Sequence, residues 1–247
     1  MTTGVTFDEP FYDEIGKYAV RFAVPVVFGE SAASSYAAAL NNGTATLLKL
    51  NHRYLAVTCY HVLASYRKRK AKHPSTMFQV GTVALEPDTH LLSEDESLDL
   101  AVLELTPFVG VEPGLTEARF VSPLNWPPAS VTTEDVLCFA GFPGIWRDQI
   151  ALGHIRLYAL SSGASAVLSV LPDRITTTIQ VAECVTQINH GKVLGSLGGM
   201  SGGPVFVWRT QPLLTAELVG FIYEYQETLD LLLVRSGSVL TDSGIVA

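Results

Sequence analysis

Short apolar segments separated by turn signals recur along this chain, and they constrain its fold more than any other feature. The segments are rich in β-branched and apolar residues and lie near residues 44–50, 54–58, 77–85, 98–105, 135–140, 155–160, 165–171, 174–182, 204–208, 217–223 and 229–234. Clusters of glycine, proline, serine or asparagine, such as 141–144, 161–163 and 189–191, lie between them. Many short strands at this spacing predict an all-β chain built from barrels or a sandwich.

One helix and one linker are expected beside the strands. Pro10 suits a first helical position, and apolar residues then recur at helical spacing, at Phe11, Ile15, Tyr18 and Phe22, so residues 8–22 are predicted to be a short N-terminal helix. Five prolines lie between 106 and 133 and favour a linker there. We therefore expect residues 1–110 to hold the helix and a first barrel, 111–132 the linker, and 133–247 a second barrel with a C-terminal tail.

Charge narrows the expected partners. The formal net charge of −8 and the pI of about 5.2 argue against general nucleic-acid binding, which requires a basic surface. The run 67–73 is a local exception, because it holds five of the sixteen Lys and Arg residues. We interpret it as a solvated loop, with docking of an acidic partner or nucleic acid as the alternative.

The cysteines indicate whether a metal site or disulfides are expected, and the first residues indicate the cellular compartment. Cys59, Cys138 and Cys184 form no C-x-x-C pair, so neither a metal site nor a cofactor is expected, and their odd number argues against a disulfide framework. The first ten residues lack the basic and apolar regions of a secretory signal, and no stretch reaches the roughly 18 apolar residues that cross a bilayer. A cytoplasmic protein without a membrane partner is the expectation.

The strongest local signal is the stretch 197–205, where Ser201 lies between two pairs of glycines. Glycine tolerates positive φ, so such a loop can aim neighbouring N–H groups at the point where a carbonyl oxygen becomes negative during acyl transfer. An ordinary glycine-rich turn before a strand is the alternative. The same residues also match G-x-S-x-G, but an α/β-hydrolase needs a histidine after the serine, and none of the six histidines follows Ser201.

A base and an acid precede Ser201 in the order that a serine nucleophile requires. His61 follows an apolar strand, where an imidazole can take and return a proton, although a structural role would fit as well. Asp99 begins another apolar strand, where a carboxylate needs a partner such as an imidazole N–H unless it lies at the surface. The other histidines lie in turns, in the charged run or in no supporting context. The order His–Asp–Ser is that of a catalytic triad in a two-barrel enzyme.

These residues resemble a known family. Residues 58–62 are similar to its T-A-A-H motif, 98–103 to its D-[IL]-A-[LV] strand and 199–204 to its G-[DN]-S-G-G-P motif. The family is the trypsin-like (chymotrypsin-fold) serine proteases, in the form of the bacterial and HtrA-type members. The resemblance implies two packed six-stranded antiparallel β-barrels, with His61 and Asp99 on the first and Ser201 on the second. It also implies an oxyanion hole made by the backbone N–H groups of Gly199 and Ser201.

The activity that the resemblance implies is that of a serine endopeptidase, acting on a protein or peptide through an acyl-enzyme. Met200 stands where digestive members carry an aspartate that receives a newly cut N-terminus, so that activation is not expected here. An activating protein partner or narrow specificity would then restrain the enzyme. The alternative is a catalytically inactive protease-fold module for binding or regulation, because the large Met200 side chain could displace the oxyanion loop.

The resemblance also suggests a substrate pocket. Its base falls at Gly195, which carries no acid, so cleavage after Lys or Arg is not predicted from that position. Its wall would be Tyr223, Glu224 and Tyr225, where the tyrosines could narrow the pocket. Glu224 could face a basic substrate side chain or point to solvent.

Overall fold

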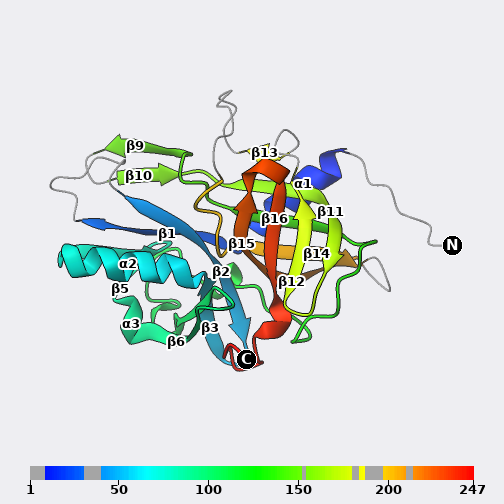
Figure 1. The fold of residues 1–247 in the computed structure, drawn as a ribbon. Coiled ribbons are helices and arrows are strands. Elements are labelled where there is room, and N and C mark those ends of the chain that lie inside the picture. Colours follow the sequence, from blue (N-terminus) through cyan, green and yellow to red (C-terminus); the bar gives the residue numbers. More distant parts are fainter. Residues whose placement is uncertain (1–8, 31–39, 152–153, 180–183, 187–196, 210–213) are drawn as a thin grey trace.

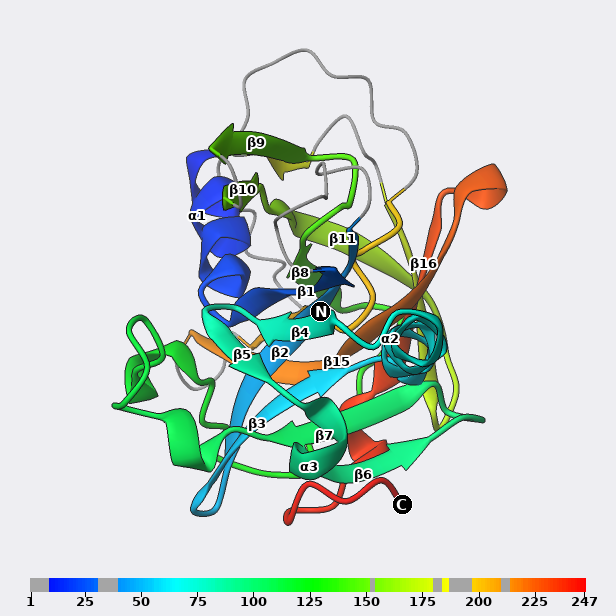
Figure 2. The same ribbon diagram turned by 90° about the vertical axis from the view of Figure 1, so that its left-hand side faces the viewer.

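The computed structural model describes residues 9–30, 40–151, 154–179, 184–186, 197–209 and 214–247. These residues form two seven-stranded antiparallel sheets and one two-stranded hairpin, which lie side by side in an elongated molecule (Figures 1 and 2). The first sheet is curled into an open half-barrel, and the second closes on itself. The expected all-β, chymotrypsin-like fold class with a short N-terminal helix is confirmed.

The first sheet comes from the N-terminal half of the chain, and its edge strands are β5 and β6. Its strands, in spatial order, are β5 (Val83–Leu85), β4 (Thr76–Val80), β1 (Ala23–Glu30), β2 (Asn41–Leu50), β3 (Arg53–Thr58), β7 (Leu100–Glu104) and β6 (Leu91–Asp95). Asn51 makes the β2–β3 turn with a φ of 52°, a conformation that asparagine tolerates better than most residues. Strands β3 and β7 lie next to each other, so their neighbouring ends bring residues 58–61 and 99 together.

The second sheet comes from the C-terminal half. Its strands, in spatial order, are β12 (Arg174–Thr178), β16 (Leu231–Ser236), β15 (Thr215–Gln226), β14 (Pro204–Arg209), β8 (Val136–Gly141), β11 (Leu160–Val170) and β13 (Val185–Thr186). Strand β12 also pairs with β11, which closes six strands into a barrel. Strands β9 (Arg147–Ala151) and β10 (His154–Leu157) form the separate hairpin.

Residues 161–163 correct one expectation. The prediction of a turn there is wrong, because these residues lie inside β11. The register of β11 against β8 shifts between Ser162 and Ser165, which marks a bulge. A bulge accommodates Gly163 without ending the strand, so the glycine marks a bulge here and not a turn.

Helix α1 (Glu9–Val20) confirms the predicted N-terminal helix. It packs mainly against β8 and β11 of the second sheet and only slightly against β1, the strand that follows it in sequence, and Ile15 and Ala19 are buried there. The C-terminal residues make the opposite crossing, because the Val246 N–H donates to Ser93 Oγ on β6 of the first sheet (3.1 Å). Each end of the chain thus ties the two halves together.

Helix α2 (Tyr60–Lys72) overturns another expectation. The interpretation of the run 67–73 as a loop is wrong, since residues 67–72 form the last turns of this helix. Buried Val62, Leu63 and Tyr66 hold one face against the first sheet. The dense positive charge obscured this short apolar face in the sequence. Within the described residues no helix is long and apolar enough to cross a bilayer.

The remaining elements are short and lie mostly in connections. They are α3 (Pro87–His90) and the 3₁₀ turns η2 (Thr106–Phe108), η3 (Glu117–Arg119), η5 (Glu227–Leu229) and η6 (Gly237–Val239). Only η2 and η3 fall in the proline-rich segment 106–133.

A shared core joins the two sheets. Leu48, Leu55 and Val57 of the first sheet belong to the same buried cluster as Phe206 and Phe221 of the second. A second cluster fills the inside of the first sheet, and a third fills the inside of the second sheet. Because apolar burial is the dominant stabilising contribution, the shared cluster holds the halves in one relative position and fixes the boundary where their loops meet.

Candidate active site

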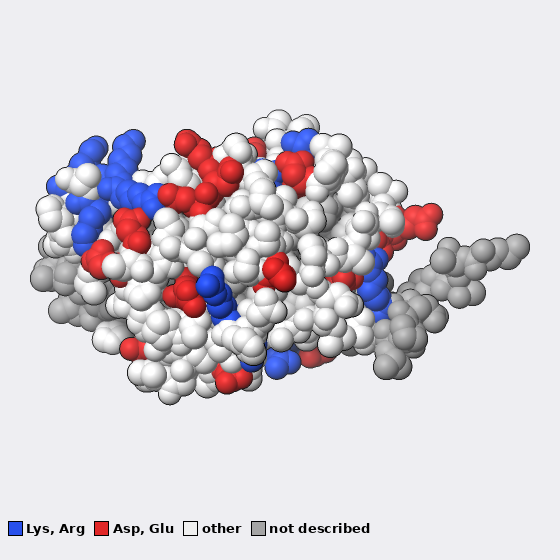
Figure 3. Space-filling view, turned by 90° about the horizontal axis from the view of Figure 1, so that it is seen from below, with Lys and Arg blue, Asp and Glu red and all other residues white. Residues whose placement is uncertain are grey.

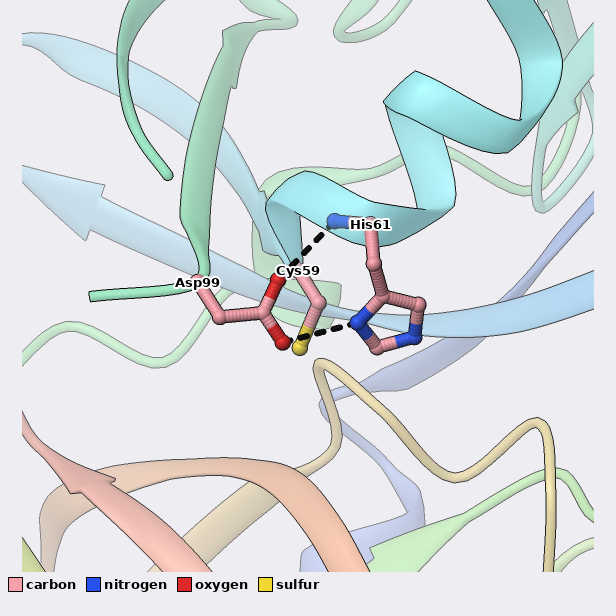
Figure 4. A group of neighbouring side chains, drawn as sticks. All are labelled: Cys59, His61 and Asp99. Carbon is pink, nitrogen blue, oxygen red and sulfur yellow. Dashed lines mark hydrogen bonds and ion pairs between the residues drawn. The ribbon is translucent and has the colours of Figure 1, made fainter. Parts of the chain in front are cut away.

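His61 and Asp99 lie together beside the neighbouring ends of strands β3 and β7 of the first sheet (Figure 4). Strand β3 ends at Thr58, Cys59 caps α2, and His61 therefore occupies the first turn of the helix. One carboxylate oxygen of Asp99 accepts the backbone N–H of His61 (2.9 Å), and the other lies 2.7 Å from His61 Nδ1. Since a carboxylate only accepts hydrogen bonds, Nδ1 carries the proton and Nε2 is left with its lone pair.

The backbone at Asp99 explains its residue type. Asp99 has a φ of 51°, in the left-handed region, at the end of the turn that precedes β7. Aspartate and asparagine are the non-glycine residues that enter this region most easily. The conformation directs the side chain toward α2, where 23% of the Asp99 side chain and 50% of the His61 side chain remain exposed.

The loop that carries Ser201 docks onto the first sheet through threonines. Thr44 Oγ1 donates to the Gly199 carbonyl (2.7 Å) and accepts from the Phe142 N–H (2.9 Å). The Thr44 N–H donates to the carbonyl of Ser201 (2.9 Å), and Thr46 Oγ1 donates to that of Gly202 (2.8 Å). The three bonds to residues 199–202 join residues more than 150 positions apart and place the serine beside the sheet that carries His61. The sequence analysis did not identify these threonines, because threonine in a strand is an ordinary strand former.

The backbone N–H groups of residues 199–203 divide into two kinds. Those of Met200, Gly202 and Gly203 donate to carbonyls of Leu197, Ile222 and Met200 at 2.6–3.2 Å. Within the part of the chain that the structure describes, the N–H groups of Gly199 and Ser201 donate to no acceptor. Two unused donors beside a serine hydroxyl are what an oxyanion hole requires.

Crowding explains the glycines of this loop. A Cβ on Gly199 would lie 2.7 Å from the Phe142 carbonyl oxygen and 2.9 Å from the Gly144 nitrogen, and closer still to Asn42 Nδ2. Gly199 also has a φ of 104°, which side chains with a Cβ rarely adopt. The loop therefore approaches its neighbours more closely than any other residue type would allow.

Met200 points away from this loop surface. Its side chain is only 1% exposed and belongs to the core cluster of the second barrel, with Phe139, Val205 and Ile222. Burial of the Met200 side chain in that core fixes the loop to the second barrel.

The hydroxyl of Ser201 lies 3.4 Å from the Tyr223 carbonyl oxygen on β15, a long contact. The thiol of Cys59 donates to the carbonyl of Ile222 on the same strand (3.4 Å). The Sγ of Cys59 also lies within 4.8 Å of the ligand atoms of His61 and Asp99 (Figure 4). Cys59 thus lies between the His61–Asp99 pair and strand β15.

The thiol of Cys59 is a poor ligand and a poor nucleophile in this setting. Complete burial, and next the negative charge of Asp99, raise its pKa well above the usual value. Metal ligation and nucleophilic attack both need the thiolate. Cys59, His61 and Asp99 are close enough to hold a metal ion, but the thiol is protonated and Nδ1 already bonds to Asp99.

A small cavity lies on one side of Ser201. Its volume is about 120 Å³, and its walls are Leu197, Gly198, Met200, Ser201, Ile222, Tyr225 and Glu227. Burial, and a hydrogen bond to Asp230, raise the pKa of the Tyr225 phenol to about 12. Glu227, at the start of η5, was not identified from the sequence.

The other residues suggested for a pocket lie elsewhere. The Tyr223 ring packs against the first-sheet core and lies under the Arg235 guanidinium, 4.4 Å from the ring centroid. Glu224 is exposed beside Gln226. The bulge between Ile222 and Glu224 changes which face of β15 the neighbouring side chains occupy. A sequence does not reveal such a bulge. Gly195 lies outside the described residues.

A larger cleft of about 720 Å³ opens on the other side. Its lining includes His61, Gly198 and Gly199 together with Asn42 and Ser65. The imidazole of His61 and the glycines that precede Ser201 therefore face one common space, at the boundary between the two halves.

Comparisons with known proteins found likenesses in structure alone. No family model matches the chain, and no curated protein matches its sequence. The fold is similar to that of the tobacco vein mottling virus protease (10% identity, 96% of this chain and 82% of that one, TM-score 0.44). It is also similar to the thermostable serine protease AL20 from an extremophilic microorganism (11%, 87% and 91%, 0.43) and to the HtrA-type protease AlgW (15%, 91% and 59%, 0.45).

Proposed function

We propose that this protein is a serine endopeptidase, with Ser201 as nucleophile, His61 as general base and Asp99 as the residue that orients the imidazole. The observation that carries the proposal is the pairing of a doubly bonded His61–Asp99 unit with a serine loop whose Gly199 and Ser201 N–H groups are unused. The first half of the proposed division, 1–110, supplies the base and the acid. The second, 133–247, supplies the nucleophile.

The first step is acylation. His61 Nε2 takes the proton of Ser201 as the hydroxyl oxygen attacks the carbonyl carbon of the scissile bond. Asp99 holds the Nδ1–H tautomer and stabilises the imidazolium that forms. The N–H groups of Gly199 and Ser201 bind the developing oxyanion, at about 3–4 kcal/mol per donor removed.

The acyl-enzyme then forms and breaks down through the same groups. The imidazolium gives its proton to the nitrogen of the leaving amine, and the C–N bond breaks as the serine ester forms. Water, deprotonated by His61, attacks the ester carbonyl; the bond from the acyl carbon to Ser201 Oγ breaks, His61 returns the proton to Oγ, and the acid product leaves. Every proton that leaves Ser201 or water passes through His61, so the balance needs no further group.

Cys59 and Met200 bear on the competing interpretations. A cysteine nucleophile would have to be Cys59, but its thiol is buried and its pKa is raised, which leaves it protonated. An inactive binding module was considered because Met200 could displace the oxyanion loop, yet this side chain is packed in the second-barrel core. Both observations favour an active serine enzyme.

A fluorophosphonate probe tests the proposal directly. We expect wild type to be labelled and to cleave members of a quenched fluorescent peptide library, and Ser201→Ala to do neither. Cys59→Ser serves as the control for a thiol nucleophile and should keep probe labelling. Equal labelling of wild type and Ser201→Ala would contradict the assignment of the nucleophile.

A further inference from the structure

A stripe of helix α2 runs from the imidazole along the large cleft. Its exposed residues His61, Ser65, Lys68 and Lys72 are spaced by four, three and four positions, so they share one face of the helix. His61 and Ser65 line the cleft of about 720 Å³. Ser65, Lys68 and Lys72 line the next hollow, of about 440 Å³, and Asn41 lines both. The two hollows therefore form one continuous groove that begins at His61.

The positive charge of this groove is largely uncompensated. Elsewhere on the helix, Arg67 pairs with Asp88 and Glu94, and Lys70 pairs with Glu86. Lys68 and Lys72 pair with no carboxylate within the described part of the chain.

The opposite wall adds Arg147, a cation that pairs with no carboxylate among the described residues. Arg147 lines the cleft at the start of β9, and its guanidinium donates to the Leu40 carbonyl (2.8 Å) rather than to an acid in the described residues. Arg69 and His73 both approach Glu30 at 3.4 Å, which is the one carboxylate near the groove that these contacts reveal. Lys and Arg side chains gather at this end of the molecule (Figure 3). On a chain of net charge −8, such a groove is a local exception.

The direction of the groove identifies which half of a substrate would occupy it. The residue whose carbonyl is attacked lies on the side of Ser201, Ile222 and Tyr225, where the small cavity is found. The amine that leaves takes its proton from His61, so the peptide attached to that amine extends past the imidazole and along α2. A helix rises about 1.5 Å per residue and an extended peptide about 3.3 Å, so Lys68 and Lys72 lie beside roughly the third and fifth residues after the scissile bond.

We propose that this basic groove selects substrates with acidic residues, aspartate or glutamate, on the leaving side of the scissile bond. The inference rests on the proposed endopeptidase function and specifies its substrate class. An acidic peptide fits the observations better than a nucleic acid. The groove is continuous with the catalytic His61 and lies on an otherwise acidic protein, which repels long polyanions.

Matched peptides test the inference. The acyl half is kept constant, and the second to fifth residues of the leaving half are glutamate, glutamine or lysine. We expect kcat/KM to be roughly tenfold higher for the glutamate peptide than for the glutamine peptide at low salt, as for two or three exposed ion pairs. In about 0.5 M salt the ratio should fall below about threefold because screening weakens exposed pairs.

Variants then locate the effect. Lys68→Gln with Lys72→Gln should bring the glutamate-to-glutamine ratio close to one, and Lys68→Glu with Lys72→Glu should favour the lysine peptide. The control carries the same change of charge away from the groove, Lys17→Gln on α1 with Lys49→Gln on β2, and should keep the wild-type ratio. An unchanged ratio in the Lys68 and Lys72 variants would overturn the inference.

Failure of the inference and failure of the proposed function give different results. If wild type cleaves the glutamate and glutamine peptides equally, the endopeptidase stands and the acidic preference is wrong. If no peptide is cleaved, fluorescence anisotropy of the glutamate leaving-half peptide on the same variants still measures the groove. A single-stranded oligonucleotide that binds more tightly than this peptide, with the same dependence on Lys68 and Lys72, would assign the groove to nucleic acid and overturn the inference.

Discussion

Replacing Gly199 by alanine tests the proposed oxyanion hole, because its effect on kcat can be compared with its effect on the free energy of unfolding. The new Cβ would meet two backbone atoms at 2.7 and 2.9 Å, and backbone cannot yield as a flexible side chain does. The φ of 104° adds a conformational cost of about 1–2 kcal/mol. The peptide must therefore rotate or shift, which removes the Gly199 N–H from its position. Losing one such donor costs about 3–4 kcal/mol of transition-state stabilisation, or about 10²–10³-fold in kcat.

The assay is kcat on one library substrate, measured beside the free energy of unfolding in urea. Gly110→Ala is the matched control, since Gly110 also has a positive φ (76°) but a Cβ there would meet nothing within 4 Å. It should lose about 1–2 kcal/mol of stability and keep its kcat. A folded Gly199→Ala protein whose kcat is within about threefold of wild type would refute the assignment of this N–H to the oxyanion hole.

Three further predictions follow from the contacts around the site. Asp99→Asn should keep its left-handed backbone and its stability but lower kcat by about 10⁴-fold, because an amide no longer selects the Nδ1–H tautomer. Stopped assays of peptide cleavage by the variant would measure this loss, and activity near wild type would contradict the role of Asp99. Thr44→Val leaves the Phe142 N–H and the Gly199 carbonyl without their partner, so urea unfolding should show a loss of about 2–4 kcal/mol and kcat should fall with it, whereas Thr44→Ser keeps the hydroxyl and should retain most of both. Burial raises the pKa of Cys138 from 9.0 to about 12, so its contribution to stability is complete below pH 9 and is lost as pH rises from 9 to 12, at about 1.4 kcal/mol per pH unit. Unfolding measured at about pH 8 and about pH 10 should show this decline, and Cys138→Ala should show a smaller one; identical slopes would contradict the shift.

Local patterns in the sequence predicted most of the strands, but not β1, β6, β9 or β13, and they singled out the three candidate side chains. Alternating and β-branched segments predicted most of the strands, because side-chain burial on a pleated sheet imposes that pattern wherever the sheet lies. Ser201, His61 and Asp99 stood out because glycines, a strand end and a costly carboxylate each leave a local mark. Helix α2 was missed because its apolar contacts, Val62, Leu63 and Tyr66, are few beside its charges.

The sequence by itself therefore determined an all-β chain, the chain order of a histidine, an aspartate and a serine, and a glycine-rich loop around that serine. Tertiary structure alone decided where these groups lie relative to the rest of the molecule. Thr44 and Thr46 hold the serine loop from more than 150 residues away, and the last turns of α2 bring Lys68 and Lys72 to the hollow that adjoins the cleft at His61. The physical reason is that hydrogen bonds and charges act through distances in space. A threonine in a strand or a lysine on a helix has the same local pattern whatever lies opposite it.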